Sequence, residues 1–159
     1  MRTATLLPDA DALHLEELVA DADAITVVVS TRGDAACCPD CGVPAARLHS
    51  RKRRRLADLP WQGLAVCLDL QLRRFYCRTP TCARRTFTER VPTVVAPHAR
   101  RTARLATVFA AIAFALGGEP GARLLAALGL AASPDTLLRT IHAAPLPAAP
   151  TPRILGVCV

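Results

Sequence analysis

The chain has 159 residues, enough for one ordinary domain or two small ones, and its apolar content of 52% with only 4% aromatics predicts small aliphatic cores. Its charge is uneven, because residues 1–36 hold two basic and seven acidic side chains while residues 37–159 hold eighteen basic and six acidic ones. The longest apolar stretch, residues 105–116, is too short to cross a bilayer, and no secretory signal opens the chain, so we expect a cytoplasmic protein with no membrane partner.

Residues 1–36 form a small acidic segment with a predicted turn at Asp21-Ala22-Asp23. Alternating apolar residues and the Val27-Val28-Val29 run on either side favour a β-hairpin with arms near 14–20 and 24–31. A short helix over residues 11–20 is the competing interpretation, since its leucines and glutamates also fit helical spacing.

Two cysteine pairs flank the next part of the chain. Cys38 and Cys41 are spaced C-x2-C, and Cys77 and Cys82 are spaced C-x4-C. With turn-forming residues inside both pairs, this spacing is typical of four thiolates that hold one structural Zn²⁺. Cys37 could replace Cys38, but the spacing to Cys41 would then be less typical, and four reduced thiols without metal are the other alternative.

The segment between the cysteine pairs is strongly basic and then alternating. A strand near 44–53 is expected to precede a turn at residues 58–63, and the period of two over residues 64–76 predicts a half-buried strand that delivers Cys77 to the metal. The candidate phosphate-contacting residues are Arg51, Lys52, Arg53, Arg54, Arg55, Arg84 and Arg85. A solvated basic loop is the alternative.

Residues 98–143 carry the spacing of three short helices. Gly117 and Gly129 are expected to end the first two, and Ser133 caps the third with Pro134 in its first turn. This pattern favours a helix-turn-helix, although any small three-helix bundle can show it. In the third helix we expect Leu137, Leu138 and Ile141 to point inward. Thr136 and Arg139 are its candidate DNA contacts.

These pieces in this order resemble the amino-terminal half of insertion-sequence transposases of the ISL-three family. The resemblance runs through Cys38-Pro-Asp-Cys-Gly42, Leu56-Ala-Asp-Leu-Pro60, Arg74-Phe-Tyr-Cys77 with Cys82, residues 84–90, residues 103–142 and Leu155-Gly-Val157. It implies a zinc-binding module, then a helix-turn-helix that binds the element's terminal DNA, and then a three-carboxylate nuclease domain. Where the resemblance places the first catalytic aspartate, this sequence has Cys158.

We therefore expect a truncated transposase with no catalytic residues and no enzymatic activity. Asp58, Asp69 and Asp135 are not substitutes for the missing carboxylates, because a turn, a strand face and a helix cap account for them. The expected fold is α+β, with a β-hairpin lead-in (1–36), a zinc-ribbon-like module (37–92), a helix-turn-helix bundle (98–143), and a Pro/Ala linker that starts a missing domain (144–159).

The expected function is binding of double-stranded DNA at the element's terminal inverted repeats, with structural zinc. Two alternatives stay open. The chain could be a regulatory fragment that forms a homodimer or assembles with full-length transposase, or it could complete a nuclease together with a separately encoded catalytic half.

Overall fold

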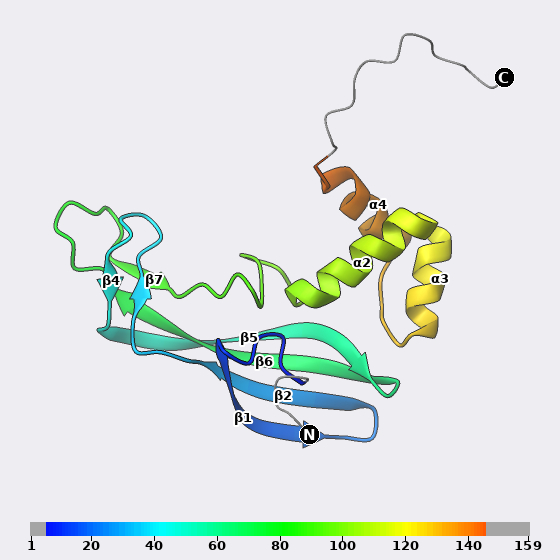
Figure 1. Cartoon of the computed structure of the whole chain (residues 1–159), viewed down its shortest axis with the longest axis horizontal. Coiled ribbons are helices and arrows are strands. Elements are labelled where there is room, and N and C mark those ends of the chain that lie inside the picture. Colours follow the sequence, from blue (N-terminus) through cyan, green and yellow to red (C-terminus); the bar gives the residue numbers. More distant parts are fainter. Residues whose placement is uncertain (1–5, 146–159) are drawn as a thin grey trace, which may run out of the picture.

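A mixed β-sheet and three helices make up residues 6–145, the part of the chain that the computed structural model describes (Figure 1). The strands are β1 (Leu13–Ala20), β2 (Ala24–Thr31), β3 (Ala36–Cys37), β4 (Pro44–Ala45), β5 (Leu48–Trp61), β6 (Leu64–Tyr76) and β7 (Thr86–Thr88), and the helices are α2 (Ala103–Leu116), α3 (Glu119–Ala127) and α4 (Pro134–Ala143). The predicted α+β class is confirmed. None of the helices in this part has the length and apolar character needed to span a bilayer. The predicted start of a further domain, beyond residue 145, lies outside the described residues.

The main sheet has the strand order β1-β2-β6-β5, with the short strand β7 also paired to β6. The predicted hairpin is confirmed, because β1 and β2 pair antiparallel and the Asp21 N–H donates to the Ala24 carbonyl over 2.9 Å. The competing helix over residues 11–20 is therefore wrong. The hairpin is not separate from the ribbon that follows, since β2 pairs parallel to β6 in the same sheet.

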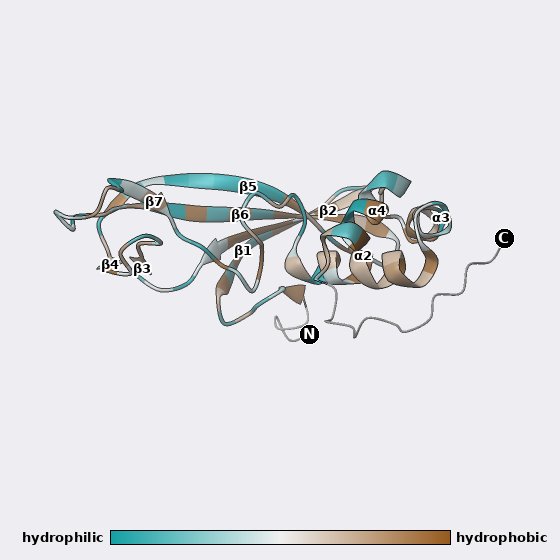
Figure 2. Ribbon diagram, turned by 90° about the horizontal axis from the view of Figure 1, so that it is seen from above, coloured by the Kyte–Doolittle hydropathy of each residue, from teal (hydrophilic) through white to brown (hydrophobic). Residues whose placement is uncertain are grey.

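The alternating strand β6 has the bounds that its pattern predicts, residues 64–76. Its even-numbered side chains from Val66 to Leu72 are buried in one aliphatic core that also takes residues from β2 and from the connector after β7. This core includes Val27, Val29, Leu56, Val66, Leu68, Leu70, Leu72, Val94 and Val95. The connector that follows β7 covers this face of the sheet with Val94 and Val95. Strand β5, in contrast, is largely hydrophilic along its length (Figure 2).

Strand β5 corrects two expectations from the sequence. It starts at Leu48 and not near residue 44, and it continues through the predicted turn at residues 58–63 as far as Trp61. The turn itself is only Gln62-Gly63, where both residues have positive φ angles, 52° and 83°. Asp58 is accordingly not a turn residue but a strand residue with 2% of its surface exposed.

Three helices form within the predicted range 98–143, although the first begins only at Ala103. Ser133 caps α4 with its side chain, and Gly117 ends α2 with a φ of 73°. Leu137 is fully buried in the helical core, as expected, but Leu138 is 42% exposed, so its predicted inward orientation is wrong. Adjacent positions of a helix lie about 100° apart, and the three-helix core is too small to cover both.

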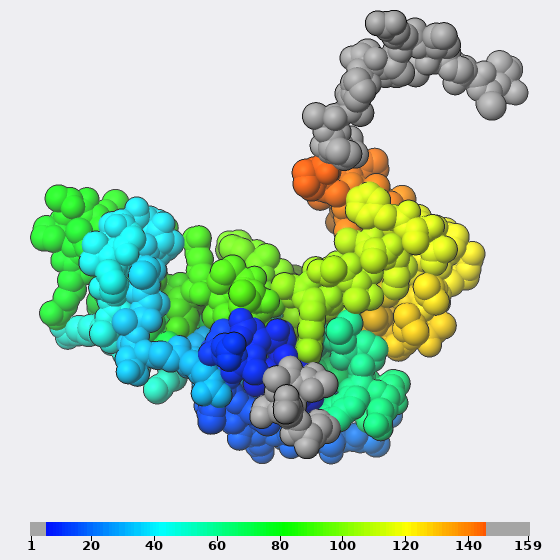
Figure 3. Space-filling view, in the orientation of Figure 1, coloured from blue at the N-terminus to red at the C-terminus, as the bar shows by residue number. Residues whose placement is uncertain are grey.

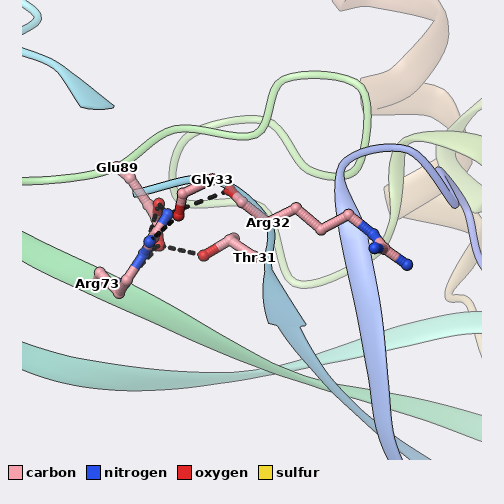
Figure 4. A network of polar contacts seen from close by, with 5 residues as sticks. All are labelled: Thr31, Arg32, Gly33, Arg73 and Glu89. Atoms are coloured by element: carbon pink, nitrogen blue, oxygen red, sulfur yellow. Dashed lines mark hydrogen bonds and ion pairs between the residues drawn. The ribbon is translucent and has the colours of Figure 1, made fainter. Parts of the chain in front are cut away.

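A buried ion pair closes the sheet at the zinc-proximal end of β2 (Figure 4). Glu89, 7% exposed, accepts from the guanidinium of Arg73 over 2.8 Å and from the Thr31 hydroxyl over 2.6 Å. Arg73 also donates to the carbonyl oxygens of Arg32 and Gly33. These contacts join β2, β6 and the segment after β7, because one carboxylate and one guanidinium are shared by all three.

Candidate metal centre and basic surface

Four cysteine sulfurs gather at the end of the sheet remote from the helices. The sulfurs of Cys38, Cys41, Cys77 and Cys82 all lie within 4.8 Å of one another. Cys38 and Cys82 are 4.0 Å apart, and Cys41 and Cys77 are 3.7 Å apart. A tetrahedral zinc ion with Zn–S bonds of about 2.3 Å separates its sulfur ligands by about 3.8 Å, so the cluster has the size of a zinc site.

Local turns bring each pair of cysteines together. In the first pair the Gly42 N–H donates to the Cys38 carbonyl over 2.9 Å, and Gly42 itself has a φ of 72°, which glycine adopts without strain. In the second pair the Cys82 N–H donates to the Thr79 carbonyl over 3.1 Å. Strand β6 ends just before Cys77, so the main sheet positions the second cysteine pair. The first pair lies in the loop of the β3–β4 hairpin.

The surroundings shift the pKa values of two of the four thiols in opposite directions. Hydrogen bonds from the Val43 N–H and the Thr79 hydroxyl lower the pKa of Cys41 to about 6. The backbone N–H of Arg84 lowers the pKa of Cys82, but burial and the three neighbouring sulfurs outweigh it and raise that pKa to about 12. Four sulfurs this close cannot all be ionised without a positive ion between them.

The donor set fits structural zinc. All four ligands are thiolates, which leaves no coordination position for a substrate or an activated water. Cys37, the alternative ligand, is exposed and lies outside the cluster. Phe75 and Phe87 pack beside the sulfurs, so the metal takes part in a small core that has few other apolar residues.

The basic run on β5 divides into engaged and available cations. Arg53 forms an ion pair with Asp69, whose side chain is 6% exposed, and Arg54 donates to the Ala99 carbonyl. Arg51, Lys52 and Arg55 are exposed and form no ion pair within residues 6–145. The five consecutive cations thus have two roles, which their sequence alone does not distinguish.

The three available cations of β5, together with Arg54 and with arginines from other segments, line two adjoining hollows beside the strand. The first, about 500 Å³, lies between β5 and β7 and contains Arg51, Lys52, Arg74 and Arg84. The second, about 760 Å³, extends from Pro39 at the zinc module along the connector to Arg100. We call the two hollows together the basic groove. The cations that line it are Arg51, Lys52, Arg54, Arg55, Arg74, Arg84, Arg90 and Arg100.

Of the cations that line the groove, Arg84 forms an ion pair with an acidic residue, Asp40, which does not line it. Glu89 lines it but is held by Arg73, which lies outside it. In the wider basic part of the chain, four of the six acidic residues, at positions 40, 58, 69 and 89, each pair with a single arginine. The surplus of positive charge therefore remains at the surface. The sequence did not single out Arg74, Arg90 or Arg100, because they are far apart in the chain and only folding brings them to one groove.

The candidate contacts on the helices lie apart from the groove, on α4. Thr136 shares a hydrogen bond of 2.9 Å with the Ser133 hydroxyl and so takes part in the helix cap. Arg139 is exposed on the outer face of α4. The segment from Leu128 to Ser133, which joins α3 to α4, is longer than the turn of about three to four residues typical of a helix-turn-helix.

Residues 34–82 match the family model described as the zinc-finger of transposase IS204/IS1001/IS1096/IS1165. The matched range includes all four clustered cysteines and the whole of β5 and β6. A search of the curated proteins and a search of the solved structures found no match. This part of the chain is therefore similar to the zinc ribbons of transposases, and its four cysteines form a structural zinc site.

Proposed function

We propose that the chain is the DNA-binding part of an insertion-sequence transposase, and that it binds double-stranded DNA at the ends of the element. The observation that carries the proposal is the basic groove beside β5, whose eight cations face the surface without a free acidic residue among the described residues that line it. Phosphate groups of a duplex are the polyanion that such a groove fits. The transposase-type zinc ribbon around it supports this choice of partner.

In this proposal the zinc site has a structural role. It fixes the loop that carries Arg84 and Arg85 against the end of β6, and so sets the shape of one end of the groove. Phosphate contacts from the groove supply affinity and orientation, while the sequence of the element's ends is read elsewhere. We assign that reading to α4, as the second helix of a helix-turn-helix whose connecting segment, residues 128–133, is longer than usual. Arg139 is its candidate for contact with a base.

Salt dependence of binding tests the role of the groove. The binding constant for a random-sequence duplex should fall steeply with salt, and a single substitution of a phosphate contact should lower the slope of log K against log[salt] by about 1. We expect this for Lys52→Gln and for Arg55→Gln. Arg32→Gln removes the same charge from a residue outside the groove, and should leave the slope unchanged.

Selection of bound sequences from a duplex library tests the second half of the proposal. A transposase end-binding protein should enrich one sequence motif, and the Arg139→Ala variant should enrich a less defined one while keeping its salt slope. Binding without any enriched motif would restrict the function to non-specific DNA binding. An equal slope for Lys52→Gln and Arg32→Gln would contradict the proposed groove.

A second candidate function, assembly with another transposase subunit, is favoured by exposed apolar side chains on the helices. Phe114 is 57% exposed, and four leucines at positions 116, 124, 128 and 138 are each at least 40% exposed. Exposed apolar side chains in such number are typical of surfaces that contact other proteins. Sedimentation with and without DNA separates the two functions, because protein assembly on this surface does not require DNA.

A further inference from the structure

A buried carboxylate joins the zinc-binding ribbon to the helices. Asp58, in the last part of β5, is 2% exposed. One of its carboxylate oxygens, Oδ1, accepts from the Thr102 hydroxyl over 2.7 Å and from Nε of Arg104 over 2.8 Å. The Arg104 guanidinium also donates to the Leu6 carbonyl over 2.9 Å, so the N-terminal segment is held at the same point.

The same junction fixes the start of α2. Thr102 is fully buried and is the N-cap of α2, because its side-chain oxygen accepts from the Leu105 N–H over 3.3 Å. Its own N–H donates to the Ala57 carbonyl over 2.9 Å, and the Ala57 N–H donates to the Arg100 carbonyl over 3.0 Å. Asp58 therefore holds the N-cap residue of α2, and the backbone of β5 holds both that residue and Arg100 just before it.

Two further contacts lie at the same end of β5. Leu59, next to Asp58 in β5, packs against the core of the three helices. The turn after α3 closely approaches the β5–β6 turn, since a Cβ atom at Gly129 would lie 3.3 Å from the Gly63 carbonyl oxygen. The helices are thus fixed at Asp58 and Leu59 of β5 and at Gly63 in the turn that follows the strand.

Strand β5 carries both the groove and this junction. Arg51, Lys52 and Arg55 line the groove, and Asp58 lies three residues beyond the last of them. In the space-filling view the surface is hollowed between the zinc module at one end and the helices at the other (Figure 3). The second part of the basic groove extends along this stretch from Pro39 to Arg100, just before α2.

We propose that Asp58 is a positioning residue that holds the helices at a fixed place relative to the basic groove, so that one DNA duplex contacts both at once. This inference rests on the proposed function and adds the geometry of the interface to it. Two weak contact surfaces on one rigid body act together, because binding at the first presents the second at a high effective concentration. A buried ion pair suits such a role, since its geometry is demanding and it specifies one arrangement.

The variant Asp58→Asn tests the proposal in the full chain. It keeps the shape of the side chain but removes the charge that holds Arg104. Asp69→Asn is the matched control, because Asp69 is also a buried strand aspartate paired to an arginine, but it lies away from the helices. Both variants are compared by zinc content and circular dichroism, which should match the wild type.

Two measurements follow the position of the helices. The distance between spin labels at positions 46 and 143, on unnatural residues so that the cysteines stay unmodified, should be narrowly distributed in the wild type and broad in Asp58→Asn. Affinity is measured for random-sequence duplexes of about one turn (about 10 bp) and about three turns. The loss for Asp58→Asn should be about tenfold or more on the long duplex and small on the short one, while Asp69→Asn should lose little on either.

A narrow distance distribution in Asp58→Asn, or an equal loss on both duplexes, would overturn the proposal. If Asp58→Asn does not fold, the pair Thr102→Val and Thr102→Ser decides, because only serine keeps the hydroxyl that Asp58 accepts. Broad distances for valine and narrow ones for serine support the role of the junction, and equal distributions contradict it. Absence of DNA binding by the wild type would contradict the proposed function, whereas the label distances still test the positioning role.

Discussion

Arg84 forms an ion pair with Asp40 across the zinc site, with Nε of the arginine 2.7 Å from the carboxylate. The two residues belong to opposite cysteine pairs, so their contact ties the knuckles together on the outer side of the metal. The arginine lowers the pKa of Asp40 from its usual value of 3.8, and the carboxylate therefore stays charged through the neutral and mildly acidic range. One cation of the basic groove is thus partly neutralised in the unbound protein.

This pairing predicts that Asp40→Asn binds duplex DNA more tightly than the wild type. The substitution frees Arg84 for a phosphate, and at low salt we expect the affinity to rise by about two- to fivefold. Fluorescence anisotropy with a random-sequence duplex measures it. Asp34→Asn changes the net charge equally at an exposed position that forms no ion pair among the described residues. An equal gain for both variants would show that net charge, and not the release of Arg84, is responsible.

The zinc site gives a second prediction, based on the difference between clustered and isolated cysteines. Cys77→Ser should lose the bound zinc and lower the melting temperature by about 10 °C or more, because the small core around Phe75 and Phe87 depends on the metal. Cys37→Ser and Cys67→Ser should keep both properties, since these thiols lie outside the cluster. Metal analysis after dialysis and a thermal melt provide the measurements. Loss of zinc in Cys37→Ser would contradict the assignment of Cys38 as the ligand in the first cysteine pair.

The sequence predicts most of the secondary structure and the whole metal site, for local reasons. Hairpin β1–β2, strand β6 and the three helices each follow from periodicity and turn residues within one short segment. The cysteines are recognisable because the metal requires a fixed spacing on each side. In each case the information lies within a few residues, so the local pattern is sufficient.

The parallel pairing of β2 with β6 and the burial of the aspartates could not be predicted in this way. Nothing near Val28 indicates that its partner is Asp69, because the two are far apart in the chain. Asp58 and Asp69 look like surface residues until Arg104 and Arg53 are brought to them by folding. The basic run likewise gives no sign that Arg53 forms an ion pair with Asp69, because the spacing of charges along one strand does not identify partners on another strand.

The ion pair between Arg73 and Glu89 leads to a third prediction, on stability. Glu89→Gln should lower the free energy of unfolding by about 2–4 kcal/mol, because Arg73, with only 18% of its side chain exposed, loses its charged partner while remaining largely buried. Chemical denaturation measures the loss. Glu17→Gln on β1 removes a carboxylate that is exposed, and should change stability by less than about 0.5 kcal/mol. Similar values for the two variants would mean that the Arg73 network does not stabilise the sheet.

Gly121 gives the last prediction, which concerns the packing of α3 on the other two helices. A Cβ atom at this position would lie 2.7 Å from Cδ1 of Leu137 and 3.3 Å from Cγ2 of Ile112, so alanine forces the leucine or the helices to move. Helix propensity favours alanine over glycine by about 1 kcal/mol. Crowding of a packed core costs about 1–3 kcal/mol, and the crowded Leu137 is fully buried, so we expect a net loss of about 1 kcal/mol or more.

The combination Gly121→Ala with Leu137→Val distinguishes crowding from other causes. The smaller valine makes room for the added methyl group, so the double variant should be less destabilised than the sum of the two single variants. Thermal denaturation of the four proteins completes the cycle. Additive losses would mean that the added methyl group does not contact Leu137, and so that α3 and α4 are not packed as closely as the structure shows. A positive coupling supports the packing on which the fixed position of α4, and with it the proposed reading of DNA by Arg139, depends.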